Sequence, residues 1–249
     1  MIFAANKNTN SQKAELDFSR RRALFLLGAS LISASAKGAS TADTRGMPGL
    51  PSCIVTPQQT EGPFFIDERL QRSDIRTDPY DGSVSVGTAL ALTLRVYAVG
   101  ANRCAPIAGA MVDIWHCDAN GHYSGVIDGT SIEKEKKFLR GFQITGRDGA
   151  VNFVTVYPGW YPGRAVHIHF KVRNNLNTRR ANEFTSQLYF DESVTDQVHS
   201  SEVYARRGRR MVLNSRDGLF QRDQGSHLLL RPEKTTTAYV AAFDIGLRM

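Results

Sequence analysis

Residues 90–98, LALTLRVYA, alternate between apolar side chains and small, polar or aromatic ones along their whole length. In an extended strand, side chains two positions apart lie on the same face, so this pattern predicts a half-buried β-strand. Asp-Gly and Asn-Gly pairs typical of tight turns separate further short apolar segments, which lie at residues 110–116, 151–156, 165–172, 185–190 and 236–245. This organisation predicts an all-β domain built as a two-sheet β-sandwich, with a brief helix at residues 202–210.

Composition and charge exclude several classes of protein. The chain has 249 residues, 41% of them hydrophobic, which is an ordinary globular composition. Its formal net charge is +7, and residues 1–36 hold +3 of it, so the remainder is too weakly basic to indicate a nucleic-acid partner. The basic run RRGRR at residues 206–210 is interpreted as a solvated loop, with steering of an anionic substrate as the alternative. No apolar stretch reaches the roughly 20 residues that a membrane span needs.

The N-terminal region has the features of an export signal. Three arginines at residues 20–22 precede a short apolar segment that ends in Ala-Ser-Ala. This order is typical of a leader of the twin-arginine (Tat) type, so we expect a leader at residues 1–36, the Tat machinery as a partner, and a periplasmic or extracellular location. Residues 37–52 predict a flexible linker, and residues 53–249 predict one domain.

Three cysteines, Cys53, Cys104 and Cys117, are too few for a disulfide scaffold. In an oxidising compartment they allow one bridge and one free thiol. The segment between Cys104 and Cys117 predicts a turn and one strand. Because a strand rises about 3.3 Å per residue, it would hold these two residues too far apart to bridge.

The most informative stretch for function is RAVHIHF, residues 164–170. As a strand, it would direct Ile168 and Phe170 to the core and place His167 and His169 together on the opposite face. Two imidazoles on one rigid face are a ready pair of metal ligands. The alternative interpretation is a pair of polar residues on a solvent-facing surface.

Two tyrosines lie near the ends of predicted strands. Tyr161 lies in PGWYPG, residues 158–163, which leads into the histidine strand, and Tyr123 follows the strand at residues 110–116. Phenolate oxygens combined with imidazoles suit Fe(III) better than Zn(II). A loop tyrosine is more often a packing residue, and Tyr157 competes with Tyr161 on spacing alone.

Four segments, in order along the chain, resemble motifs of the intradiol ring-cleavage dioxygenases. They comprise a segment similar to the protocatechuate 3,4-dioxygenase type, a first tyrosine motif, a second tyrosine and histidine motif, and a later strand; these are TPQQTEGPFF (residues 56–65), WHCDANGHYS (115–124), TVYPGWYPGRAVHIHF (155–170) and QLYF (187–190). The resemblance covers residues 53–190, and residues 214–220 are compatible with the family's C-terminal part.

The resemblance implies a β-sandwich that holds one mononuclear non-haem Fe(III). Tyr123 and His167 would be its equatorial ligands, and Tyr161 and His169 its axial ligands, with a solvent hydroxide completing the shell. Tyr161 would also leave the metal and accept a proton from the substrate.

The resemblance further implies roles for two pocket residues. Arg164 would stabilise negative charge on the substrate, and a surface ion pair is its alternative role. Gln187 would be a hydrogen-bonding partner behind the ligands, and an ordinary polar strand residue is the alternative. Trp160 and Gly163, on the loop of the second tyrosine, are expected to influence substrate choice.

The implied reaction inserts both atoms of O2 into a catechol-type substrate. It cleaves the bond between the two hydroxyl-bearing carbons and gives a cis,cis-muconate-type diacid. The helical N-terminal linker typical of catechol 1,2-dioxygenases is expected to be missing, which puts their mode of dimerisation in doubt. The identity of the catechol and the oligomeric state, including a homo-oligomer, stay open.

Two other functions are compatible with parts of the sequence. His116, Asp118 and His167 imitate the two-histidine, one-carboxylate triad of Fe(II) oxygenases, although this interpretation leaves both tyrosine motifs unexplained. An exported β-sandwich binding module with an inactive metal site is the second alternative.

Overall fold

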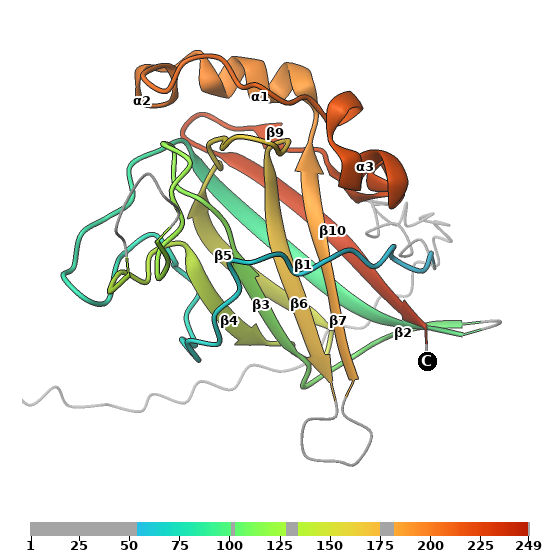
Figure 1. Ribbon diagram of the computed structural model, residues 1–249. Helices are drawn as coiled ribbons and strands as arrows, with labels where there is room; N and C mark the ends of the chain where they lie inside the picture. The colour runs from blue at the N-terminus through green and yellow to red at the C-terminus, as the bar shows by residue number, and fades with distance from the viewer. Residues whose placement is uncertain (1–53, 101–102, 128–133, 175–181, 249) are drawn as a thin grey trace, which may run out of the picture. The chain divides into compact units, whose positions relative to one another are not determined.

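The computed structural model describes residues 54–100, 103–127, 134–174 and 182–248. The leader, the linker and Cys53 lie outside these ranges. The described strands form two sheets (Figure 1). The first sheet contains, in spatial order, β2 (Arg103–Pro106), β1 (Ala89–Gly100), β10 (Tyr239–Arg248) and β9 (Glu233–Lys234), with β5 (Ala150–Val156) also paired to β1. The second contains β4 (Arg140–Ile144), β3 (Met111–Trp115), β6 (His167–Asn174), β7 (Asn182–Phe190) and β8 (Leu229–Leu230).

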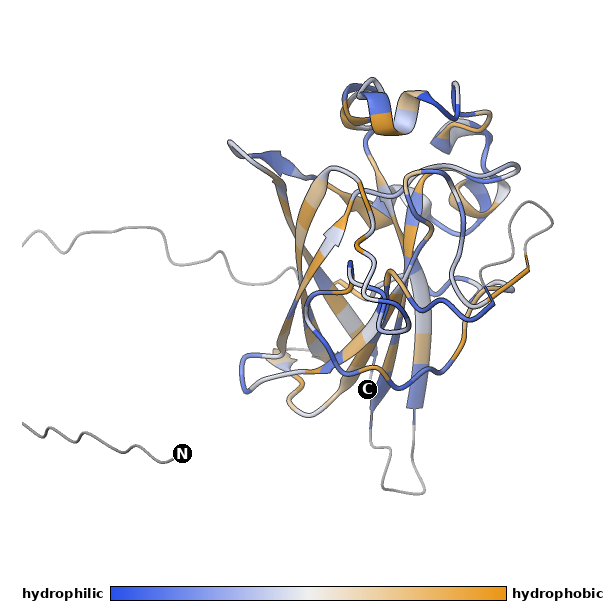
Figure 2. Ribbon diagram, turned by 90° about the vertical axis from the view of Figure 1, so that its left-hand side faces the viewer, coloured by the Kyte–Doolittle hydropathy of each residue, from blue (hydrophilic) through white to orange (hydrophobic). Residues whose placement is uncertain are grey.

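The core lies between the two sheets and follows the alternation in the sequence. Leu90, Leu92 and Leu94 of β1 are buried, and they share one hydrophobic cluster with Ile168 and Phe170 of β6. Figure 2 shows hydrophobic and hydrophilic residues alternating along the strands. The predicted all-β sandwich is therefore confirmed, because burying one face of each sheet against the other removes these side chains from water.

The opposite face of the second sheet is also covered, and β6 is buried along its whole length. Strand pairing places Arg140, Trp115, His169 and Gln187 in one row across β4, β3, β6 and β7. Residues 54–76, which we call the N-terminal strap, run across this face (Figure 1). The backbone of the strap is hydrogen-bonded to β7 and to β4, so the row lies beneath it.

Helical turns connect β7 to β8 and lie at one end of the sheets (Figure 1). Asp191 and Asp217 cap two of them by accepting hydrogen bonds from backbone N–H groups of the first turn. The predicted helix at residues 202–210 ends early, at Ala205. No helix in the described part of the chain is long and apolar enough to span a membrane. The turns are α1 (Glu192–His199), α2 (Glu202–Ala205), η1 (Asn214–Arg216), α3 (Gly218–Arg222) and η2 (Gly225–Leu228).

The basic run after α2 is not simply a solvated loop, so that interpretation is wrong for two of its arginines. The Arg207 Nε donates to the Trp160 carbonyl oxygen at 3.0 Å, and its guanidinium lies 5.1 Å from the centre of the Trp160 ring. The Arg210 side chain is 7% exposed and forms an ion pair with Glu192. Both arginines therefore stabilise the packing of neighbouring segments.

Candidate metal centre

β6 brings two imidazoles together at its N-terminal end, on the face that the strap covers. His167 and His169 are 2% and 1% exposed, and their Nε2 atoms lie 3.0 Å apart. The Nδ1 atom of His167 lies 2.7 Å from the Ala165 carbonyl oxygen, which only accepts, so Nδ1 carries the proton. Burial lowers the pKa of His167 to about 3, so the neutral ring directs its Nε2 lone pair into the site.

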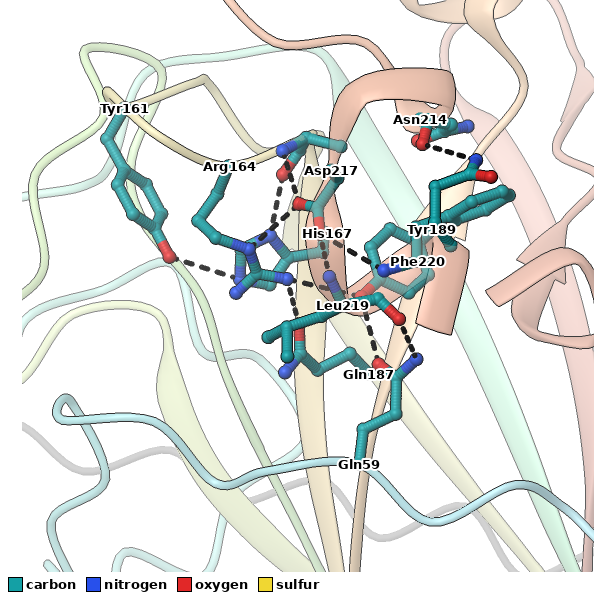
Figure 3. A network of polar contacts seen from close by, with 12 residues as sticks. Gln59, Tyr161, Arg164, His167, Gln187, Tyr189, Asn214, Asp217, Leu219 and Phe220 are labelled. Atoms are coloured by element: carbon teal, nitrogen blue, oxygen red, sulfur yellow. Dashed lines mark hydrogen bonds and ion pairs between the residues drawn. The ribbon is translucent and has the colours of Figure 1, made fainter. Parts of the chain in front are cut away.

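Tyr161 reaches the same point from the loop before β6. Its hydroxyl lies 3.3 Å from the His167 Nε2 and donates to it (Figure 3). The ring is partly buried, whereas Pro162 and Gly163 that follow are exposed. Gly163 has a φ of +88°, a left-handed conformation that glycine adopts without strain.

Tyr123 completes the group from the loop after β3. It is fully buried, and its ring contacts those of Tyr161 and His169 edge-on, at centroid distances of 5.6 and 6.3 Å. Phe64 of the strap stacks on its other side at 4.4 Å. The Tyr123 hydroxyl is buried without a hydrogen-bond partner among the described residues, which is a costly arrangement unless another group satisfies it.

The chemistry of these four side chains fits a cation. Burial raises the pKa of Tyr161 to about 12 and raises that of Tyr123 well above its ordinary value, so both phenols are protonated when no cation is near. A bound metal ion would displace those protons, because ligands bind in their deprotonated form. In the described ranges no group of three His, Cys, Asp or Glu side chains could hold a metal. The two histidines would therefore need the tyrosine oxygens to complete a metal site, and this donor set suits Fe(III).

The two tyrosine loops approach each other through glycines. The Gly159 N–H donates to the Asp118 carbonyl oxygen at 3.0 Å, and a Cβ on Gly159 would lie 2.5 Å from that oxygen. Gly121 has a φ of +83°, and a Cβ there would lie 2.1 Å from the Trp160 carbonyl oxygen. Neither position has room for a side chain, so the glycines set how close the tyrosines come.

Arg164 lies beside the histidines in a fixed orientation (Figure 3). Its Nε donates to Asp217 at 2.8 Å, and one terminal nitrogen donates to the Gln187 side-chain oxygen at 2.6 Å and to the Tyr189 hydroxyl at 3.1 Å. The side chain keeps 17% of its surface exposed. Arg164 therefore forms an ion pair, but with a buried carboxylate and together with a contact to Gln187, not at the surface as the alternative role supposes.

Asp217 is a residue of this site that the sequence did not single out. It is wholly buried, accepts a bond from the Ala165 backbone N–H at 2.8 Å, and caps α3. Burial opposes its ionisation, but that hydrogen bond and the Arg164 charge hold the pKa of Asp217 below its ordinary value. The only local signal was a helix-capping aspartate before Gly218, because its partners are distant in the chain.

The Fe(II) triad alternative does not fit the geometry. Both ring nitrogens of His116 are engaged, with the Cys117 carbonyl at 2.8 Å and the Thr155 hydroxyl at 2.7 Å. The Asp118 carboxylate accepts from two backbone N–H groups of its own loop. Tyr157 is a core residue whose hydroxyl bonds Thr195, so Tyr161 is the tyrosine of this loop that reaches the histidines.

Cys117 is buried as a free thiol, 3.5 Å from the Gly159 carbonyl oxygen. A bridge between Cys117 and Cys104, which the strand length disfavours, is therefore absent.

Comparisons relate this chain to known dioxygenases. A family model described as "Dioxygenase" matches residues 60–244. An intradiol ring-cleavage dioxygenase from Tetranychus urticae is 32% identical, with a TM-score of 0.67 over 79% of this chain and 95% of that one. The dioxygenase domain of a dioxygenase carbohydrate-binding fusion from Streptomyces sp. SirexAA-E is 28% identical, with a TM-score of 0.55 over 79% of this chain and 99% of that one.

Curated relatives match over shorter stretches. The 6-chlorohydroxyquinol 1,2-dioxygenase of Cupriavidus pinatubonensis is 30% identical over 27% of this chain and 30% of its own length. The matches to curated relatives span between 30% and 56% of their lengths.

Proposed function

Because this chain belongs to the intradiol ring-cleavage dioxygenase family, we propose that it cleaves a catechol-type aromatic diol with O2. The bond between the two hydroxyl-bearing carbons would break, and both oxygen atoms would enter a cis,cis-muconate-type diacid. The observation that carries the proposal is the convergence of Tyr123, Tyr161, His167 and His169 on one buried point, where the two Nε2 atoms lie 3.0 Å apart.

These four side chains would hold one mononuclear non-haem Fe(III). When bound, the ion would supply Lewis acidity that stabilises the anionic form of the diol. The hydrogen bond from the His167 Nδ1 to the Ala165 carbonyl would fix the ring orientation during binding.

Tyr161 is the residue best placed to take a proton from the substrate. Its hydroxyl already points into the site, and on the C-terminal side of its loop no atom lies within 4 Å of a Cβ built on Gly163. A phenolate at Tyr161 would accept one hydroxyl proton of the diol at its own oxygen as the ring moves.

Arg164 would stabilise the negative charge left on the bound substrate. Asp217 and Gln187 hold its guanidinium in a fixed orientation, so little reorganisation is needed when the charge develops. Phe64 and Trp115 pack against Tyr123 and His169 and keep water from that side of the site.

Iron analysis and oxygen uptake on a panel of substituted catechols test the proposal. We expect stoichiometric iron, a visible ferric-phenolate colour and O2 consumption. Tyr123→Phe should weaken the colour, because Tyr161 is the other phenolate of the proposed site, and should abolish O2 uptake. Asp118→Asn, the matched control, keeps the acceptor oxygen of the loop and should leave both unchanged.

The alternatives predict different results. A protein with stoichiometric iron and no O2 uptake on any catechol would be an inactive binding module. A colourless iron protein that loses its metal in Asp118→Asn would indicate an Fe(II) triad instead.

We also propose that the chain is exported through a Tat-type leader at residues 1–36. The arginines at residues 20–22 support this. Replacing all three with lysine should retain the precursor in the cytoplasm, as measured by fractionation and N-terminal sequencing. Unchanged export would contradict the Tat assignment.

A further inference from the structure

Arg140 of β4 is a buried cation whose hydrogen bonds all end on neutral groups. It is 3% exposed, and among the described residues it forms no ion pair with a carboxylate; the charge of Glu68 favours the guanidinium from a greater distance, but Glu68 pairs with Lys137. One terminal nitrogen donates to the Phe64 carbonyl oxygen at 2.6 Å, and the other donates to the Ser124 carbonyl oxygen at 2.5 Å. Its Nε donates to the Ser124 carbonyl and hydroxyl oxygens, both at 3.0 Å.

Arg173, on the same face of the sheet, shows the usual solution for a buried arginine. Its guanidinium pairs with Asp113 at 2.8 Å and with Asp67 at 3.0 Å. Removing a charge from water is costly unless the protein compensates it, so the absence of such partners at Arg140 requires a physical reason.

The two residues that Arg140 binds both adjoin Tyr123. Ser124 follows Tyr123 directly in the chain, and the Phe64 ring stacks on the Tyr123 ring at 4.4 Å with an interplanar angle of 23°. The guanidinium carbon of Arg140 lies 6.0 Å from the centre of the Tyr123 ring. Its cross-strand partner Trp115 stacks on His169 at 4.9 Å, so Arg140 adjoins the site from two directions.

We propose that Arg140 is a positioning residue of the metal centre, which holds the Tyr123 phenol in place by joining Ser124 to Phe64 and sets a positive charge beside that ring. The inference rests on the proposed function, because the oxygen of this phenol would bind the metal. An anionic oxygen at Tyr123 would compensate the buried charge that no described carboxylate pairs with.

The shape of the guanidinium is central to this role. Its rigid fork presents donors in several directions at once, which lets one side chain bond both Phe64 and Ser124. Lysine would keep the charge but concentrate it on a single nitrogen. Arg140→Lys therefore tests the bridge between the two segments, and Arg140→Gln removes the charge as well.

Spectroscopy of the iron-loaded protein provides the main test. We expect both Arg140 variants to retain iron about 10- to 100-fold less tightly and to shift or weaken the visible phenolate-to-iron band. Arg72→Gln is the matched control, because Arg72 also bonds backbone carbonyls, including that of Arg140, and contacts none of the described tyrosine rings. It should lower the thermal midpoint and leave the band per iron unchanged.

Three results would overturn the proposal in this test. The first is a wild-type band and wild-type iron retention in both Arg140 variants. The second is an equal change of band and retention in Arg72→Gln. If Arg140→Gln does not fold, Ser124→Ala takes its place, since it removes one acceptor of the Arg140 hydrogen bonds and keeps the others. The third result is then an unchanged band in both Ser124→Ala and Arg140→Lys.

A cycle on the metal-free protein separates this proposal from the proposed function. The thermal midpoints of Arg140→Lys, Tyr123→Leu and the double variant should be non-additive if Arg140 acts on the Tyr123 ring, which leucine removes, whether or not iron binds. Additive shifts would overturn the positioning role. A wild-type protein that takes up no iron would instead overturn the proposed function and leave the cycle interpretable.

Discussion

Replacing Gly121 with alanine tests how closely the two tyrosine loops must approach. Gly121 has a φ of +83°, and an L side chain in that conformation costs about 1–2 kcal/mol. The new Cβ would lie 2.1 Å from the Trp160 carbonyl oxygen, whereas ordinary contact begins at 3.4 Å, so one loop has to move by the difference of 1.3 Å. Relieving such overpacking costs about 1–3 kcal/mol more, for a total of about 2–5 kcal/mol.

Gly82→Ala and Gly109→Ala are matched controls. Their φ angles are +74° and +77°, and a Cβ at either position meets no atom within 4 Å, so they carry the backbone cost alone. In a domain of this size 1 kcal/mol lowers the thermal midpoint by about 2–4 °C. We expect midpoints lower by about 2–8 °C in the controls and by about 4–20 °C in Gly121→Ala.

The functional effect should exceed the loss of stability. Trp160 directly precedes Tyr161, and a misplacement of about 1 Å near reacting groups costs about 100-fold in rate. Oxygen uptake by iron-loaded Gly121→Ala should fall by about that factor at a temperature where all variants are folded. Equal midpoints for Gly121→Ala and Gly109→Ala would refute the close approach, and full oxygen uptake would refute the dependence on loop position.

Three further perturbations have directions set by the structure. Tyr123→Phe should leave unchanged or raise the thermal midpoint of the metal-free protein, because it removes a buried hydroxyl without a described partner. With iron added, the wild type should have the higher midpoint, because it binds the metal more tightly. A lower midpoint of the metal-free variant would contradict the unpaired state of the hydroxyl. Arg207→Gln should cost about 1–2 kcal/mol in urea unfolding and alter Trp160 fluorescence, whereas no change would mean a solvated arginine. The Asp217 carboxylate stabilises the fold at pH values above its ordinary pKa of 3.8, and this stabilisation is lost as the pH falls through its lower pKa in the native state. Asp217→Asn should remove this contribution to the free energy of unfolding. Urea titrations of this variant and the wild type should therefore converge toward low pH, and parallel curves would contradict the role of the Arg164 charge.

The alternation of apolar and polar residues predicted the β-strands, because it is a pattern with a period of only two residues. β6 carries Ile168 and Phe170 on its core face and both histidines on the other, as the pattern at residues 164–170 predicts. A period of two needs only local information, so the six predicted strands are present with boundaries displaced by a few residues.

The sequence pattern predicted neither β4 nor the residues that hold the side chains of the site in place. β4 contains Gly141 and a buried arginine, so its five residues show no alternation. Asp217 contacts Arg164 from 53 residues away, and Arg140 contacts Phe64 from 76 residues away. Such pairs exist only after the strap and the helical turns have packed, because no local pattern records which distant partner a charged side chain meets.

The roles that the resemblance gave to the four ligands stay predictions, although the structure gathers their side chains. The interpretation of RRGRR failed for a different reason. Charge alone suggests solvent, but Arg207 packs its guanidinium on Trp160, which long cationic side chains do readily.

The eight residues of β6 place one set of side chains in the core and direct the alternate set, which includes both histidines, to the candidate metal centre. Sliding this strand by one position would send the imidazoles into the hydrophobic core and place Ile168 and Phe170 at the candidate metal centre. Natural variants of this chain should therefore tolerate changes of length in the hairpins far more readily than inside β6. A protein with one residue inserted into or deleted from β6 would lose the packing of its core and the arrangement of its histidines together.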